Sequence, residues 1–155
     1  MPLTNKHIVA IDDTHSILTF LRISLEALGA MFHGAATAAG GIALCESIQP
    51  DLLILDLNLP DREGLNILPR IKHLSKERNL PVIVLTVHNE KEARDKAMSL
   101  GADAYITKPF IMDELIEVIS NQLSTERESR LTLVKVDDKG AASFHPGDRT
   151  RSKIQ

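Results

Sequence analysis

Short apolar segments alternate with longer segments of helical periodicity along residues 7–123, and this alternation restricts the fold more than any other feature of the chain. Segments rich in Val, Ile and Leu predict buried β-strands. Five such strands are predicted, at residues 7–11, 31–35, 52–55, 82–85 and 104–106. Helices are predicted between Thr14 and Gly29, between Thr37 and Pro50, and over residues 65–74, 91–100 and 112–123.

Strict alternation of strands and helices with short connections requires right-handed crossovers, so a parallel sheet with helices on both faces is expected. The continuously apolar segment Leu52–Leu55 is typical of a strand buried on both sides in such a sheet. Five βα units favour a doubly wound α/β fold with the flavodoxin-like strand order 2-1-3-4-5 over the six-stranded dinucleotide-binding order. Pro69 lies inside the third predicted helix, where it either kinks the helix or marks a later start.

Composition and charge exclude several classes of protein. A hydrophobic share of 43% in 155 residues is enough for one globular core. The net charge of -3 provides no basic field for nucleic acid, and the apolar segments are too short to cross a membrane, so neither partner is expected. Cys45 is the single cysteine and is predicted to be a buried, inert thiol. Residues 1–6 lack the apolar core of a secretion signal, so a cytoplasmic location is expected.

The strand and helix pattern stops near residue 124, which predicts a globular domain over residues 5–124 and a C-terminal tail over 125–155. Three interpretations of the tail remain open. It is a flexible extension, a short hairpin built from Leu131–Val136 and Ala141–Phe144, or the start of an output region of a longer protein.

Chemically competent side chains follow or end four of the five predicted strands. Asp12 and Asp13 follow the first strand, Asp56 ends the third, Thr86 ends the fourth and Lys108 follows the fifth. The carboxyl ends of parallel strands meet at one edge of the sheet, and strands one and three are neighbours at the topological switch point, where such sheets bind ligands. These five side chains are therefore expected to converge.

Three carboxylates close together repel one another unless a cation neutralises them or one of them is protonated. Mg²⁺ prefers oxygen ligands, and a backbone carbonyl near Asn58 could complete the set. Beside such a cation, Asp56 is predicted to act as a carboxylate nucleophile toward a phosphoryl donor. The Lys108 ammonium and the Thr86 hydroxyl would then stabilise the phosphoryl oxygens.

Residues 6 to about 124 resemble a response-regulator receiver domain of bacterial two-component signalling, of the chemotaxis-regulator type. The resemblance lies in four motifs: Asp12-Asp13, the segment from Asp56 to Pro60 with Gly64, Leu85-Thr86, and the segment from Gly101 to Phe110 that contains Lys108-Pro109.

The resemblance implies a role for each matching residue. Asp56 would be the phosphoacceptor, Asp12, Asp13 and the backbone carbonyl of Asn58 would be ligands of Mg²⁺, Lys108 would bind the phosphoryl group, and Thr86 and Tyr105 would be the switch pair. It also implies that the phosphodonor is a histidine kinase or a histidine phosphotransfer protein. The output would pass through the fourth helix, fifth strand and fifth helix. A protein of this kind catalyses only its own phosphorylation and dephosphorylation.

Two positions depart from the pattern of the family. Val87 stands where the residue is commonly small, so its branched side chain is expected to slow phosphorylation or hydrolysis. Ala104 stands where the winged-helix transcription-factor subfamily usually has an acid, which speaks against the charged dimer interface of that subfamily.

Two functions of other classes remain as alternatives. The segment Asp56-Leu57-Asn58 superficially resembles the signature of haloacid-dehalogenase-like magnesium phosphatases, although those enzymes have a second aspartate where this chain has Asn58. A flavodoxin-like cofactor carrier would share the topology, but acids replace the phosphate cradle after the first strand. His88 lies beside Thr86 and is interpreted as a solvated loop histidine.

Overall fold

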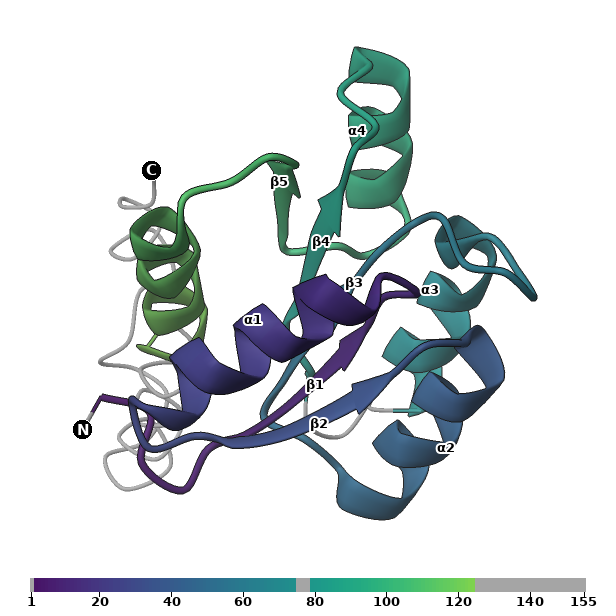
Figure 1. Cartoon of the computed structure of the whole chain (residues 1–155). Coiled ribbons are helices and arrows are strands. Elements are labelled where there is room, and N and C mark those ends of the chain that lie inside the picture. Colours follow the sequence, from purple (N-terminus) through teal and green to yellow (C-terminus); the bar gives the residue numbers. More distant parts are fainter. Residues whose placement is uncertain (1, 75–78, 125–155) are drawn as a thin grey trace, which may run out of the picture. The chain divides into compact units, whose positions relative to one another are not determined.

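The computed structural model describes residues 2–74 and 79–124, and it contains one five-stranded parallel sheet (Figure 1). The strands lie in the order β2-β1-β3-β4-β5, and every neighbouring pair is parallel. Their bounds are β1 His7–Ile11, β2 Met31–Ala35, β3 Leu52–Leu55, β4 Val82–Thr86 and β5 Ala104–Thr107. The predicted flavodoxin-like order and the predicted parallel sheet are confirmed.

Each predicted helix is present among the described residues. They are α1 His15–Glu26, α2 Ala38–Ile48, α3 Gly64–Leu74, α4 Lys91–Ser99 and a C-terminal helix over residues 112–124. Because α3 begins at Gly64, Pro69 lies within the helix and does not mark a later start. The hairpin considered for Leu131–Val136 and Ala141–Phe144 lies outside the described residues. No helix of the described part is long and apolar enough to span a membrane.

Helices cover both faces of the sheet (Figure 1) because each buried strand has apolar residues on both sides. In β1, Val9 and Ile11 face a core to which α2, α3 and α4 contribute. Ile8 and Ala10 face a second core to which α1 and the C-terminal helix contribute. The doubly wound arrangement therefore follows from the continuous apolar character of the strands.

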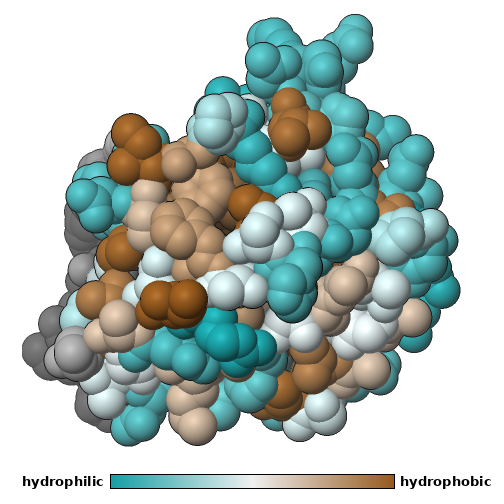
Figure 2. All heavy atoms as spheres, in the orientation of Figure 1, coloured by the Kyte–Doolittle hydropathy of each residue, from teal (hydrophilic) through white to brown (hydrophobic). Residues whose placement is uncertain are grey.

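Apolar side chains are also exposed where α1 lies beside the start of the C-terminal helix. Phe20 is 46% exposed, Ile23 65% and Ile111 61%, and the rings of Phe20 and Phe110 lie 6.1 Å apart. Figure 2 shows hydrophobic atoms gathered on this face, whereas mostly hydrophilic atoms cover α4. Exposed apolar clusters of this kind are typical of protein contact surfaces.

An ion pair between Lys72 and Asp103 lies at the amino-terminal edge of the sheet, and both side chains also bond to the backbone. Lys72 of α3 donates from its Nζ to the Leu80 carbonyl at 2.7 Å and to Asp103 Oδ2 at 3.0 Å. The same Asp103 oxygen accepts a hydrogen bond from the Val82 N–H at 2.8 Å. These bonds join α3 to the starts of β4 and β5, at the edge opposite to the predicted site.

The start of α3 lies against the backbone that follows β3, and only a glycine fits there. A Cβ added at Gly64 would lie 2.5 Å from the Asp56 carbonyl oxygen and 2.8 Å from Leu57 Cα. Both are backbone atoms, so they cannot move aside as a side chain could. Gly64 therefore sets the distance between α3 and the residues that follow β3.

Gly64→Ala is expected to lower the free energy of unfolding by about 1–3 kcal/mol, the usual range for overpacking a tight contact. Urea titration followed by circular dichroism measures this change. Gly40→Ala is the control, because its added Cβ would meet only side-chain atoms, the nearest at 3.1 Å. Equal stability of the Gly64→Ala variant and the natural protein would contradict the close approach.

Candidate metal site at the carboxyl edge of the sheet

The hydrogen bonds of the sheet bring two of the predicted acids together. β1 and β3 are neighbours, with Ile11 opposite Leu55. The next residue of each chain segment is an aspartate, and the Asp56 N–H donates to the Ile11 carbonyl at 2.9 Å. On its other side, the Asp12 N–H donates to the Ala35 carbonyl of β2 at 3.0 Å. The positions of Asp12 and Asp56 thus follow directly from strand order and register.

Three carboxylates form a cluster at this edge. One oxygen each of Asp12, Asp13 and Asp56 lies within 4.8 Å of the other two, a separation that one metal ion can bridge. Asp12 and Asp56 are 2% and 4% exposed, while Asp13 faces solvent. Within residues 2–74 and 79–124 this is the one group of three or more potential His, Cys, Asp or Glu ligands. Hard oxygen ligands of this kind suit a cation such as Mg²⁺.

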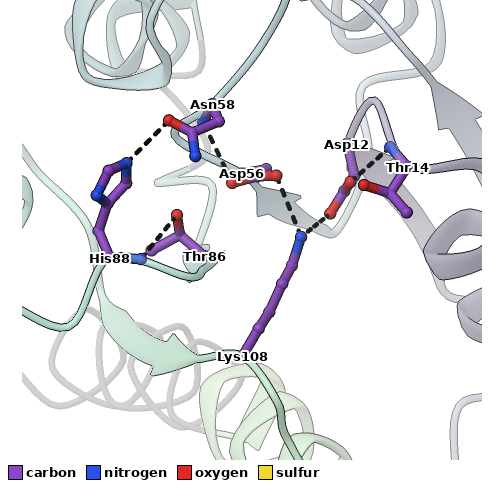
Figure 3. A network of polar contacts seen from close by, with 7 residues as sticks. All are labelled: Asp12, Thr14, Asp56, Asn58, Thr86, His88 and Lys108. Atoms are coloured by element: carbon purple, nitrogen blue, oxygen red, sulfur yellow. Dashed lines mark hydrogen bonds and ion pairs between the residues drawn. The ribbon is translucent and has the colours of Figure 1, made fainter.

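Lys108 follows the edge strand β5, and its side chain extends to the acidic cluster (Figure 3). Its Nζ donates to Asp12 Oδ2 at 2.7 Å and to Asp56 Oδ2 at 3.1 Å. Its backbone N–H donates to the Thr86 carbonyl at 2.7 Å, and the bond between Lys108 and Pro109 is cis. The continued pairing of β4 with β5 therefore places the start of this long side chain, and the two carboxylates hold its end.

Burial and the contacts between Lys108 and the aspartates have opposite effects on the pKa, both for Asp12 and for Lys108. Burial raises the pKa of Asp12 above its ordinary value, and the hydrogen bonds from Lys108 and from the Thr14 N–H only partly offset that effect. For Lys108, burial is the largest single influence on the pKa and lowers it, because burial disfavours the charged form. The hydrogen bonds and charges of Asp12 and Asp56 together outweigh it and raise the pKa of the ammonium. Lys108 is therefore held as a cation beside acids that repel each other.

The loop after β3 carries Asn58 over the same cluster. The Asn58 N–H donates to Asp56 Oδ1 at 3.2 Å and so orients the carboxylate. The Asn58 side-chain oxygen lies 2.8 Å from His88 Nε2, which is the donor because the amide oxygen can only accept (Figure 3). The backbone carbonyl of Asn58 was the predicted metal ligand, and its loop lies beside the acids.

His88 has a larger part in the site than the sequence suggested. It is 39% exposed, yet its ring contacts Asn58 and lies 3.6 Å from a Glu90 carboxylate oxygen. His88 is thus a partly exposed loop residue, as interpreted from the sequence, and it also contacts the side chain of Asn58. Its position two residues after a strand-end threonine was the only sequence signal, and the partner Asn58 lies 30 residues away.

Thr86 and Tyr105 are linked through the backbone of His88. Thr86 is fully buried at the end of β4, and its hydroxyl oxygen is 3.5 Å from the His88 N–H. The Tyr105 hydroxyl donates to the His88 carbonyl at 2.8 Å, and burial raises the pKa of Tyr105. This hydroxyl is therefore bonded to the backbone of the neighbouring loop. The loop after β4 thus contacts both members of the predicted switch pair.

Comparison with known proteins points to one family. The family model of the response regulator receiver domain matches residues 8–120. The chain is 38% identical over 109 residues to the transcriptional regulatory protein KdpE of Mycobacterium tuberculosis strain H37Rv, a match that covers 70% of this chain and 47% of that protein. It therefore spans about half the length of this relative.

Solved structures agree with the sequence relatives. A CheY-like response regulator receiver domain protein from Methanospirillum hungatei JF-1 superimposes with a TM-score of 0.77 and 32% identity, over 81% of this chain and 99% of that one. The beryllofluoride-activated NtrC4 receiver domain has a TM-score of 0.73 and 27% identity, over 77% of this chain and 98% of its own. With a matching family model over residues 8–120, relatives above 30% identity and the expected fold, this chain belongs to the response regulator receiver domain family.

Proposed function

We propose that residues 5–124 form a phosphorylation switch in which Asp56 accepts a phosphoryl group from a phosphohistidine. The donor is a histidine kinase or a histidine phosphotransfer protein. One observation carries this proposal. The Asp56 carboxylate is nearly buried, lies in a cluster with two further acids, and has the Lys108 ammonium at 3.1 Å. Such a carboxylate is kept close to a fixed positive charge and to potential metal ligands, as phosphoryl transfer requires.

The acidic cluster has the hard oxygen ligands that suit Mg²⁺. Asp12, Asp13 and Asp56 supply carboxylate oxygens within 4.8 Å of one another. The backbone carbonyl of Asn58, in the loop that begins at Asp56, would add a fourth ligand. The remaining ligands would be water and a phosphoryl oxygen, which suits a cation that keeps part of its hydration shell. When bound, Mg²⁺ supplies positive charge that offsets the negative charge of the phosphoryl oxygens.

The chemical step follows from the positions of the side chains. A carboxylate oxygen of Asp56 attacks phosphorus while the bond from phosphorus to the donor imidazole nitrogen breaks, and the imidazole leaves with that electron pair. Lys108 already contacts Asp56 and would contact an oxygen of the new acyl phosphate. The buried Thr86 hydroxyl at the end of β4 would contact another. The protein would thus catalyse only its own phosphorylation and the later hydrolysis.

The switch would act through the loop after β4. The phosphoryl group adds about two negative charges at the sheet edge, which would draw the Thr86 hydroxyl toward it. The Tyr105 hydroxyl donates to the His88 carbonyl of the same loop. Movement of this loop would therefore alter or break the hydrogen bond that holds the tyrosine ring. The surface of α4, β5 and the C-terminal helix would then differ between the two states, and a partner that prefers one of them would shift the population.

The described domain would act through protein partners. The expectation that nucleic acid is excluded is not kept, because two relatives of this chain are named DNA-binding regulators. The apolar surface around Phe20 and Ile111 lies on α1, which follows the acids of the first loop, and on the segment that follows Lys108. We propose that a phosphodonor protein contacts this surface as it approaches Asp56. KdpE is named a transcriptional regulatory protein, and any DNA-related role of a longer form of this chain is a separate proposal.

Exposure to a small acyl phosphate with Mg²⁺ should increase the intact mass of the natural protein by one phosphoryl group. Asp56→Asn should show no increase, because the amide is not a nucleophile of this kind. Chelation of Mg²⁺ should abolish the increase in the natural protein. Steady release of phosphate from simple esters, with no covalent intermediate, would instead favour the magnesium phosphatase alternative.

Lys108→Met should lower the melting temperature in metal-free buffer, because Asp12 and Asp56 would lose the cation that both of them bind. Added Mg²⁺ should raise the melting temperature of the variant more than that of the natural protein. Its acyl phosphate formation should be slower by on the order of a hundredfold, since a positive charge at the transferred group is lost. Differential scanning calorimetry and intact-mass time courses measure the two effects. An equal effect of Mg²⁺ on both proteins would count against a shared site.

Tyr105→Phe should take up the phosphoryl group at nearly the natural rate, because the hydroxyl contacts the His88 carbonyl and not the acids. Phosphorylation should change amide hydrogen exchange over residues 87–100 less than in the natural protein. Tyr105→Ala should reduce that change further and weaken partner binding. Parallel loss of uptake and of the exchange response would show that Tyr105 acts on the chemistry itself.

A further inference from the structure

The first turn of α2 is bonded to the loop that follows Asp56. Asp61 Oδ1 accepts a hydrogen bond from the Ala38 N–H at 2.8 Å, and Asp61 Oδ2 accepts one from the Ala39 N–H at 3.0 Å. These two hydrogen bonds form the Asp61 clamp. Asp61 is exposed, and its partners lie 23 and 22 residues earlier in the chain. The hydrogen bonds from Ala38 and Ala39 lower the pKa of Asp61, so the carboxylate is charged at neutral pH.

The sequence of α2 explains why this helix needs an external acid. Its first turn contains no acidic residue, and the Thr37 hydroxyl accepts only the third N–H, from Gly40 at 3.0 Å. Gly40 and Gly41 are adjacent, and each is a weak helix former. The N–H groups of a first helical turn have no partner within the helix, and a negative charge there is favourable. Asp61 supplies both the acceptors and the charge.

The same end of α2 also packs beneath the strand that leads to Asp12. A Cβ added at Gly41 would lie 2.2 Å from Ile11 Cδ1 and 2.4 Å from Ile11 Cγ1. Ile11 is fully buried and directly precedes Asp12. Contact between a helix and a strand end this close leaves little freedom for either of them.

The loop from Asp56 to Gly64 is itself compact. The Asn58 N–H donates to the Asp56 side chain at 3.2 Å, and the Gly64 N–H donates to the Leu57 carbonyl at 2.8 Å. Asn58 and Glu63 also form an isolated antiparallel bridge. A displacement of Asp61 would therefore be passed to Asn58, because the loop has few independent backbone torsions left.

We propose that the Asp61 clamp positions the ligands of the metal site. The clamp holds the loop that carries Asn58 against α2, and α2 supports the end of β1, which leads to Asp12. This inference rests on the proposed metal-dependent function. α2 is then the common support of ligands from two separate loops. Asp61 itself would not contact the metal; it would fix the distance between the ligands.

Coupling of this kind is reciprocal. If the clamp favours the geometry that binds Mg²⁺, then bound Mg²⁺ must favour the clamp by the same factor. The amide hydrogens of Ala38 and Ala39 are the direct reporters, since they form the clamp. Their exchange with solvent should slow when Mg²⁺ is added to the natural protein, and the exchange of α4 amides should change less.

Asp61→Asn and Glu63→Gln form a matched pair for the test. Each change removes one negative charge from the same loop, so the long-range effect of charge on a cation is similar. Only Asp61→Asn replaces one of the two clamp acceptors with an amide NH₂ that faces a backbone N–H. Isothermal titration calorimetry with Mg²⁺ should show a dissociation constant raised about tenfold by Asp61→Asn, as for other residues that position metal ligands, and about twofold or less by Glu63→Gln.

The outcomes separate this inference from the proposed function. Equal Mg²⁺ affinities of the two folded variants, or unchanged exchange of the Ala38 and Ala39 amides on addition of Mg²⁺, would overturn the clamp alone. No Mg²⁺ binding by the natural protein would overturn the proposed function together with the clamp. Circular dichroism establishes that both variants are folded. If Asp61→Asn does not fold, the exchange measurement on the natural protein still decides the question.

Discussion

Repulsion between carboxylates that the sheet forces together is the constraint on which the rest of the site depends. The pairing of β1 with β3 places Asp12 and Asp56 side by side, and both are almost completely buried. A buried charge is unfavourable unless it is paired, and here one ammonium serves both acids, with Nζ at 2.7 and 3.1 Å. Lys108 offsets part of this negative charge, and the three clustered carboxylates could also hold a metal ion.

The loops around these acids are held from outside the cluster. Asn58 orients Asp56 through its N–H, His88 contacts the Asn58 side chain, and Tyr105 bonds the His88 carbonyl. The loop after β3 is therefore linked to the loop after β4 and, through Tyr105, to β5. A change of charge at Asp56 acts on a set of connected hydrogen bonds.

The opposite edge of the sheet has a different character. There Lys72 and Asp103 join α3 to the starts of β4 and β5, and the same carboxylate accepts a backbone N–H. The ammonium and the carboxylate of this pair offset each other, whereas at the carboxyl edge three carboxylates lie around the single ammonium of Lys108.

The residue pattern alone was enough to predict the fold and the members of the acidic cluster. Continuous apolar strands can be buried only in a parallel sheet covered on both faces, and residues at the ends of such strands meet at one edge whatever the details of packing. Asp12, Asp13, Asp56 and Lys108 could be found this way because the backbone alone brings them together. The roles of these residues in phosphoryl transfer remain predictions from the sequence and the proposed function.

The contacts between the loops became known from the folded structure and could not be predicted from the residue pattern. The contact of His88 with Asn58, the bond from Tyr105 to the His88 carbonyl and the clamp between Asp61 and α2 join residues 17–30 positions apart, in segments without a periodic pattern. α3 likewise begins before Pro69, since Gly64 allows the close approach to β3 that a local propensity does not reveal. Side-chain hydrogen bonds between loops form or are lost with changes of a few tenths of an ångström in the distance between donor and acceptor. Packing sets those distances, and a pattern of residue types does not contain them.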